Sequence, residues 1–285
     1  MTIFFDGVAY GTLLFLISVG LSVTLGLMNF VNLAHGAFAM LGGYVCVLLL
    51  NRAGAPFPVA ALGAAVAAAV AGAVLERFLY RRLYAAPHLD HALFSIGIVL
   101  MSIATAHYLF GAQQQPLQLP SYLQGQFSLP GIDIGVYRLC LVVVGLLIAG
   151  GLQLAIARTR FGAQLRASVD NPRAARGVGI DVDRVFSLAF AAGSALAGLG
   201  GALGVEMLGL DPSFPIKYLV YYLIVVTAGG SGNVIGSLVA AVILGVADAA
   251  GKYYVPQIGA FVIYVVMILM LILRPQGLFG RRAMR

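Results

Sequence analysis

Charge is scarce in this sequence. Of its 285 residues only 9% are charged, whereas 61% are hydrophobic and the mean hydropathy is +0.98. Ordinary soluble domains carry roughly 25% charged residues. Ten acidic and 17 basic side chains cannot cover the surface of a soluble protein of this size. The composition therefore excludes a cytosolic globular enzyme and a disordered chain, and indicates a protein surrounded by the lipid bilayer.

Nucleic-acid binding is excluded as well. The net charge is +7, but the basic residues do not form an amphipathic or aromatic-laced basic surface. We therefore expect no nucleic-acid partner.

Cysteines and catalytic motifs are also lacking. The two cysteines, Cys46 and Cys140, lie in apolar runs and provide neither a disulfide framework nor a metal site. The sequence contains no GxxxxGKS/T loop, no HExxH and no GxSxG motif. We therefore expect no enzyme activity, cofactor or metal in this chain. If it takes part in active transport, another polypeptide must hydrolyse the nucleotide.

The sequence consists mainly of long apolar runs. A helix needs about 20 apolar residues to cross a bilayer. The runs predict an all-α integral membrane protein, with residues 1–285 forming one transmembrane domain of 8–10 helices. The expected spans are 7–28, 33–51, 58–75, 91–111, 138–157, 185–208, 217–230, 234–252 and 258–274.

The seventh expected span is short and ends in a glycine-rich sequence, Gly229-Gly-Ser-Gly-Asn233. No continuous helix favours that sequence. We predict a broken or re-entrant segment, which is tolerated at membrane depth only where protein buries it.

The basic residues indicate an orientation. Thirteen of the 17 fall on one side of the predicted bundle: Arg77, Arg81, Arg82, Arg158, Arg160, Arg166, Arg173, Arg176, Arg184, Arg274, Arg281, Arg282 and Arg285. Because cytoplasmic loops carry the excess of Lys and Arg, we expect this side and the C-terminus in the cytoplasm. The 112–137 loop then lies outside. Its Pro130-Gly131 pair predicts a turn and a short hairpin, either as a solvated connector or as a docking site for an external partner.

The cytoplasmic loop 158–184 contains helix signals. Asp170 or Asn171 is a suitable N-cap, Pro172 suits the first helical position, and Gly177 stops the helix. We predict a short helix that docks a partner, formed by Asp170, Asn171, Pro172, Arg173, Ala174, Ala175, Arg176 and Gly177. The alternative is an ordinary basic connector. Asp181 is expected to cap the following span.

Ionisable residues are rare inside the spans. Inside them the notable ones are His35, His107, Glu206 and Asp248, with Asp6 at the edge of the first span, and no chain of carboxylates or histidines crosses the bilayer. That argues against a proton- or sodium-driven pump. Asp248 and Lys252 are four residues apart and can pair on a helix.

The densest polar group surrounds the start of the second span. It contains Asn29, Asn32, His35 and Gly36. Together with Gly229, Gly230 and Gly232, these residues are candidates for the translocation path or its gate. The alternative is a tight turn whose small residues pack helices. Helix packing is also the expected role of the small residues Gly193, Ala197, Gly200, Gly201 and Gly204.

Several motifs together resemble a known family. The segments that carry the resemblance are 29–44, 170–180, 229–237 and 274–280. In this order they are similar to the branched-chain amino-acid permease subunit of ABC importers, the LivH type. The resemblance covers essentially the whole chain.

The resemblance implies a fold like that of the type II importer permeases, with two halves of inverted topology, in a bacterial inner (cytoplasmic) membrane. It implies four kinds of partner: a LivM-like second permease, two ATP-binding subunits of the LivG and LivF type that hold ATP and Mg²⁺, and a periplasmic or lipid-anchored substrate-binding protein. Residues 170–177 then correspond to the helix that docks on the ATPase.

The implied substrates are branched-chain or other hydrophobic amino acids. Urea, amides and aromatic acids are alternatives, because members of the family also transport these. A stand-alone secondary transporter or a channel is the alternative from another functional class.

Overall fold

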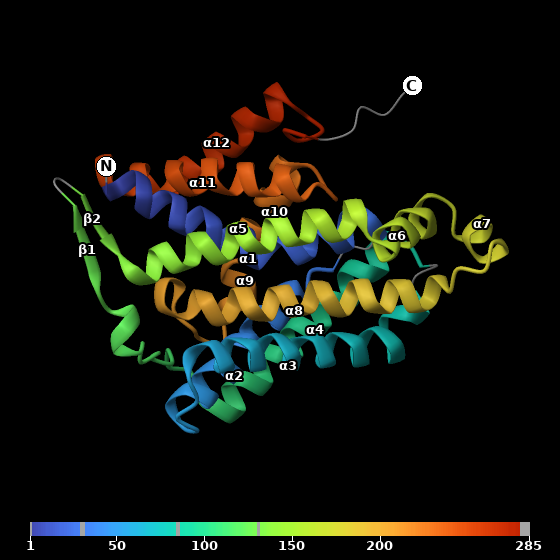
Figure 1. The fold of residues 1–285 in the computed structure, drawn as a ribbon, viewed down its shortest axis with the longest axis horizontal. Helices are drawn as coiled ribbons and strands as arrows, with labels where there is room; N and C mark the ends of the chain where they lie inside the picture. The colour runs from blue at the N-terminus through green and yellow to red at the C-terminus, as the bar shows by residue number, and fades with distance from the viewer. Residues whose placement is uncertain (1, 29–31, 84–85, 130–131, 280–285) are drawn as a thin grey trace.

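The computed structural model describes residues 2–28, 32–83, 86–129 and 132–279, and most of them are helical (Figure 1). The α-helices are α1 (Thr2–Met28), α2 (His35–Asn51), α3 (Phe57–Phe78), α4 (His88–Phe110), α5 (Val136–Arg158), α6 (Arg160–Asp170), α7 (Pro172–Gly177), α8 (Val182–Leu208), α9 (Phe214–Lys217), α10 (Leu219–Gly229), α11 (Val234–Tyr254) and α12 (Gly259–Leu273). The remaining elements are the 3₁₀ turns η1 (Tyr80–Leu83) and η2 (Ser121–Leu123) and the strands β1 (Gln126–Leu129) and β2 (Ile132–Gly135).

The predicted spans correspond to helices. Six helices are long and apolar enough to cross a membrane: α1, α3, α4, α5, α8 and α11. Three shorter apolar segments, α2, α9 with α10, and α12, account for the other expected spans. The prediction of a polytopic, all-α membrane protein is confirmed, while the inverted relation of its halves stays a prediction.

The seventh expected span is broken, as predicted. α10 has 11 residues, which gives a length of about 16 Å against about 30 Å of bilayer hydrocarbon. Its Ile224, Val225 and Val226 are buried in protein. Gly230 and Gly232 then adopt φ values of +93° and +79°, a region that favours glycine, and the chain turns back into α11.

Glycines let α8 approach its neighbours closely. A Cβ atom on Gly201 would lie 1.9 Å from the carbonyl oxygen of Ala39 on α2. A Cβ atom on Gly200 would lie 2.8 Å from the backbone nitrogen of Ile17 on α1. The expectation that these glycines pack helices is confirmed, since no larger residue fits at either contact.

Burial separates an inner helix from outer ones. Within their membrane-spanning windows, 83% of α1 is buried, but only 17% of α4 and of α5. α1 meets α11 at Gly11, where a Cβ atom would lie 2.5 Å from the carbonyl oxygen of Ala241. α1 is therefore enclosed by protein, and the exposed apolar faces of α4 and α5 remain for lipid or a partner subunit.

The predicted hairpin is confirmed. β1 and β2 pair antiparallel, with Phe127 opposite Ile134 and Gln126 opposite Gly135. Pro130 and Gly131 of the expected turn lie outside the described residues. The hairpin and α7 lie at opposite ends of the long axis of the molecule (Figure 1).

One element was not predicted. Residues 160–170 were expected to be loop, but they form the amphipathic helix α6. The Thr159 side chain caps it by accepting a hydrogen bond from the Gly162 amide at 3.1 Å. One face of α6 packs on the start of α8, in a cluster of Phe161, Leu165, Val169, Val185 and Ala189. The three arginines around this segment conceal its four-residue apolar spacing.

The glycine contacts predict a difference between two alanine substitutions. Gly201→Ala should lower the stability of the chain in detergent by about 1–3 kcal/mol, because an overpacked contact must open. Gly150→Ala on α5 meets nothing within 4 Å and should leave stability unchanged or raise it slightly. The measurement is the thermal unfolding midpoint of each purified variant. Equal midpoints would contradict the packing explanation.

Candidate functional site

The short helix α7 forms where its caps predict. The Asn171 side-chain oxygen accepts a hydrogen bond from the Ala174 amide at 3.0 Å, and Pro172 occupies the first turn. The Val178 amide closes the other end on the Ala174 carbonyl at 3.2 Å. Asn171 is therefore the cap, and Asp170, the other candidate, ends α6 instead.

α7 projects from the end of the molecule. Its Ala175 is 3% exposed, but Arg173, Arg176 and Gly177 are exposed, and Val178 just after it is 78% exposed. A helix this short is not stable alone. The buried Ala175 anchors it to the rest of the chain, an ion pair with α8 orients it, and the rest of its surface faces outward.

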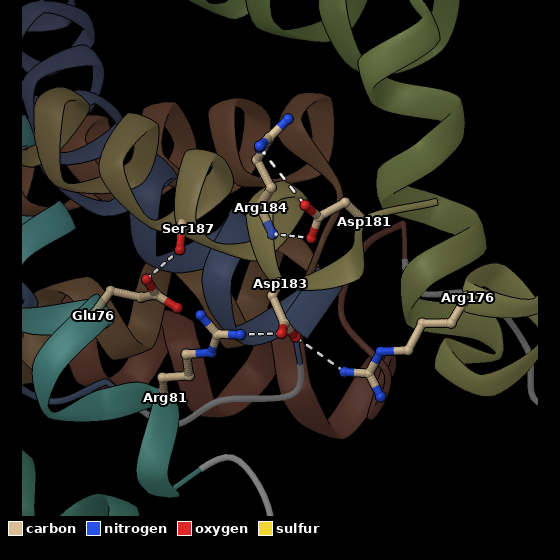
Figure 2. A network of polar contacts seen from close by, with 7 residues as sticks. All are labelled: Glu76, Arg81, Arg176, Asp181, Asp183, Arg184 and Ser187. Carbon is tan, nitrogen blue, oxygen red and sulfur yellow. Dashed lines mark hydrogen bonds and ion pairs between the residues drawn. The ribbon is translucent and has the colours of Figure 1, made fainter. Parts of the chain in front are cut away.

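An acidic side chain on α8 holds α7 in place. The Asp183 carboxylate accepts one hydrogen bond from Arg176 of α7, at 3.0 Å, and another from Arg81 of η1 (Figure 2). All three side chains are partly exposed, between 36% and 58%. Exposed pairs contribute about 0–1 kcal/mol each, so this network orients α7 more than it stabilises the fold.

Within the described ranges, the side chain of the neighbouring Asp181 makes polar contacts with its own segment alone. Its side chain accepts a hydrogen bond from the Arg184 amide at 3.0 Å, which caps α8, and pairs with the Arg184 guanidinium at 3.7 Å. The predicted cap is confirmed.

A buried carboxylate lies beneath this network. Glu76, in the last turn of α3, is 0% exposed and accepts a hydrogen bond from the Ser187 hydroxyl of α8 (Figure 2). Sequence reasoning missed it because the expected third span ended at residue 75. The signal was present, since a carboxylate at the end of an apolar run needs a partner when it is buried.

The path candidates at the start of α2 are buried. The Asn32 side-chain oxygen accepts hydrogen bonds from the Ala34 amide at 3.1 Å and the Tyr80 hydroxyl at 3.3 Å. Asn32 therefore joins the start of α2 to η1. Asn29, the other asparagine candidate, lies outside the described residues.

His35 and Gly36 contact three other helices. The Nε2 of His35 lies 2.7 Å from the Ile17 carbonyl oxygen of α1, and its ring meets Tyr222 of α10 edge-on at 6.3 Å between centroids. A Cβ atom on Gly36 would lie 2.9 Å from the Pro215 Cα of α9. These residues form a tightly packed junction of α1, α2, α9 and α10.

The glycine candidates form the turn between α10 and α11. The Gly232 amide donates to the Ser22 carbonyl of α1 at 3.1 Å. The C-terminal segment covers the turn, with the Leu278 amide bonded to the Ala228 carbonyl at 2.8 Å and the Asn233 amide group bonded to the Phe279 carbonyl at 3.2 Å.

A cavity of about 530 Å³ opens beside this turn, between α5, α6 and the C-terminal segment. Its polar lining includes Arg166, Asp170, Ser231 and Asn233. The glycine turn thus lies beside α6, at the end of the molecule that carries α7.

The opposite end contains separate ion pairs. The Lys252 ammonium lies 2.6 Å from the Asp248 carboxylate, which confirms the predicted pair. Asp6 of α1 pairs with Arg138 of α5 next to the hairpin. Neither pair belongs to the group around α7.

The fold defines a polytopic helical membrane protein, and comparison with known proteins defines which kind. The model of the family described as branched-chain amino acid transport system / permease component matches residues 3–271. The chain belongs to this family of transport permease components.

Individual relatives are similar over nearly their whole length. The chain is 28% identical to the high-affinity branched-chain amino acid transport system permease protein BraD of Pseudomonas aeruginosa, covering 97% of this chain and 94% of that protein. It is also 28% identical to the permease protein LivH of Escherichia coli, with the same coverage. The probable LivH of Methanocaldococcus jannaschii is 28% identical, with 96% and 90% covered. No solved structure matches the chain.

The cap of α7 predicts a change in local opening. Asn171→Ala should destabilise α7 by about 1 kcal/mol. That raises the open population, and with it trypsin cleavage after Arg173 and Arg176, by roughly fivefold when opening is fast. Asn171→Asp keeps a capping oxygen and should be cleaved like the parent. Peptide mapping over time gives the rates, and equal rates for the two variants would show that the cap does not hold α7.

Proposed function

We propose that this chain is the membrane-spanning permease of an ATP-driven importer, in which it forms half of the translocation path. The family match over residues 3–271 carries the proposal. ATP and Mg²⁺ belong to partner ATPases, and this chain contributes the path and the docking helix.

Residues 170–177 are the ATPase-coupling segment in this proposal. Three features support it: α7 is capped at both ends, it projects from the molecule, and its Arg173 is exposed. Among the described residues, Arg173 has no ion pair or side-chain hydrogen bond within the chain. A short projecting helix with a free cation fits a groove that carries acidic side chains.

The orientation follows from the same proposal. The α7 end faces the cytoplasm, where the ATP-binding subunits of the LivG and LivF type lie, and the C-terminus is cytoplasmic. The hairpin end faces outward, toward a periplasmic or lipid-anchored substrate-binding protein. A LivM-like second permease completes the path, and the membrane is the bacterial inner membrane. The positive-inside distribution of 13 of 17 basic residues supports this arrangement.

The proposed substrates are branched-chain or other hydrophobic amino acids. The relatives named above are branched-chain amino acid transport permeases, which supports this choice. The scarcity of buried charge fits a substrate that is neutral overall. Asn32, His35, Gly36, Gly229, Gly230 and Gly232 are the proposed path or gate residues, and Asn29 is proposed from the sequence alone.

Charge reversal on α7 tests the docking role. Arg173→Glu should weaken retention of the ATPase subunits at least about tenfold, because like charges facing across an interface cost several kcal/mol. Arg52→Glu, an exposed residue at the far end of α2, changes the net charge equally and should retain them. Retention is measured by pull-down from membranes. Full retention by Arg173→Glu would contradict the assignment.

Reconstitution tests the transport class and the substrate. Proteoliposomes that contain both permeases, the ATPases and the binding protein should take up labelled leucine only with ATP, and unlabelled urea or phenylacetate should not compete. This chain alone should give no flux. Gradient-driven flux through the chain alone would identify a secondary transporter, and flux without a driving force would identify a channel.

A further inference from the structure

Asp183 connects two segments that lie far apart in the sequence. Its carboxylate binds Arg176, seven residues before it on α7, and Arg81, 102 residues before it on η1 (Figure 2). A single side chain is thus shared by the projecting helix and by the turn that ends the α3 segment. Any displacement of α7 must change the geometry at this carboxylate.

The contact continues from η1 to the start of α2. Tyr80 directly precedes Arg81 and is 0% exposed, with its ring packed between Phe94 of α4 at 5.2 Å and Phe190 of α8 at 5.1 Å between centroids. Its hydroxyl donates to Asn32 at 3.3 Å. Asn32 in turn accepts the Ala34 amide just before His35. A continuous set of contacts therefore joins α7 to the proposed gate residues.

The two acidic contacts between the α3 segment and α8 differ in rigidity. Glu76 is buried and bound to Ser187, so it holds the end of α3 to the first turns of α8. Asp183 lies one helical turn earlier and is partly exposed with two cationic partners. The buried Glu76–Ser187 contact keeps α3 and α8 together. The exposed carboxylate of Asp183, which is shared between Arg81 and Arg176, allows α7 and η1 to shift.

We infer that Asp183 is a positioning residue that carries the movement of α7 through Arg81 and Tyr80 to Asn32 and the start of α2. The inference rests on the proposed function of α7 as the coupling helix. Asp183 has no role in docking, because it lies at the base of α7 while Arg173 belongs to the projecting surface. Its removal should therefore separate ATP hydrolysis from transport without releasing the ATPases.

The test uses the assembled importer in proteoliposomes, with three readouts: ATPase retention, ATP hydrolysis, and labelled leucine taken up per ATP hydrolysed. For Asp183→Asn we expect retention and hydrolysis like the parent, and leucine uptake per ATP lowered at least about fivefold, the lower end of typical coupling between sites. Arg81→Gln should behave alike. The double variant should be no worse than either single one, because both remove the same link.

Asp181→Asn is the matched control. It removes the same charge two residues away, keeps a capping oxygen for α8, and touches neither α7 nor η1 in the described structure. This variant should take up as much leucine per ATP hydrolysed as the parent. Tyr80→Phe keeps the ring but removes the hydroxyl bond to Asn32, so it should also lower leucine uptake per ATP, since it breaks the next contact along the set.

Two outcomes would overturn the inference. One is that Asp183→Asn and Asp181→Asn transport equally well per ATP. The other is that Asp183→Asn releases the ATPases, which would make it a docking residue. Other measurements would show that the proposed function itself fails. These are full retention of the ATPases by Arg173→Glu, and leucine uptake by the parent importer without ATP.

Discussion

The close approach of α8 to three neighbours depends on glycine at the contact points. Lipid does not drive helices together as water does, so association relies on packing at short distance. A Cβ atom on Gly198 would lie 2.4 Å from the Ala68 Cβ of α3, and one on Gly42 of α2 would lie 2.1 Å from the Gly198 carbonyl oxygen. Wider spacing would move the start of α8 away from the end of α3. The Glu76–Ser187 bond and the Arg81–Asp183 pair both require this spacing.

This packing holds the membrane-spanning part of α8 rigidly, whereas α7 is joined to the start of α8 by a partly exposed ion pair. Buried helix contacts resist deformation, because protein interiors are close-packed. Partly exposed ion pairs break and re-form at little cost in free energy. The chain places the first kind of contact along the membrane-spanning part of α8 and the second kind where α7 joins it. Motion imposed on α7 is thus expected to alter the ion pairs of Asp183 before it alters the packing of the membrane-spanning helices.

Local features of this arrangement could be predicted from the sequence. The caps at Asn171 and Asp181 and the break at Gly230 depend on residues within one helical turn, so spacing alone indicates them. α7 does end at Gly177, but the glycine that adopts a positive φ, +88°, is Gly179. The pair of Asp248 and Lys252 is local in the same way. α6 could also have been found from Phe161, Leu165 and Val169, although its surrounding arginines favoured a loop.

The contacts between distant segments could not be predicted. Nothing in the sequence relates Arg81 to Asp183 or Tyr80 to Asn32, because both contacts depend on the depth at which α3 packs on α8. Glu76 was missed although its place at the end of an apolar run could have indicated it, and nothing in the sequence indicates its partner Ser187. The candidate site was therefore foreseen as separate motifs, and only the packing of α8 brings these motifs together.

The arginines of the 158–184 segment divide into two groups once these contacts are known. Arg166 binds the Ile156 carbonyl, Arg176 binds Asp183, and Arg184 pairs with Asp181. In the part of the chain that the structure describes, no such contact engages the side chains of Arg158, Arg160 and Arg173. Net charge alone would assign all six the same role of orienting the protein in the membrane. Half of them instead make contacts within the chain, from α6 to α5, from α7 to α8 and at the cap of α8. The other three are available to meet lipid headgroups or an acidic partner.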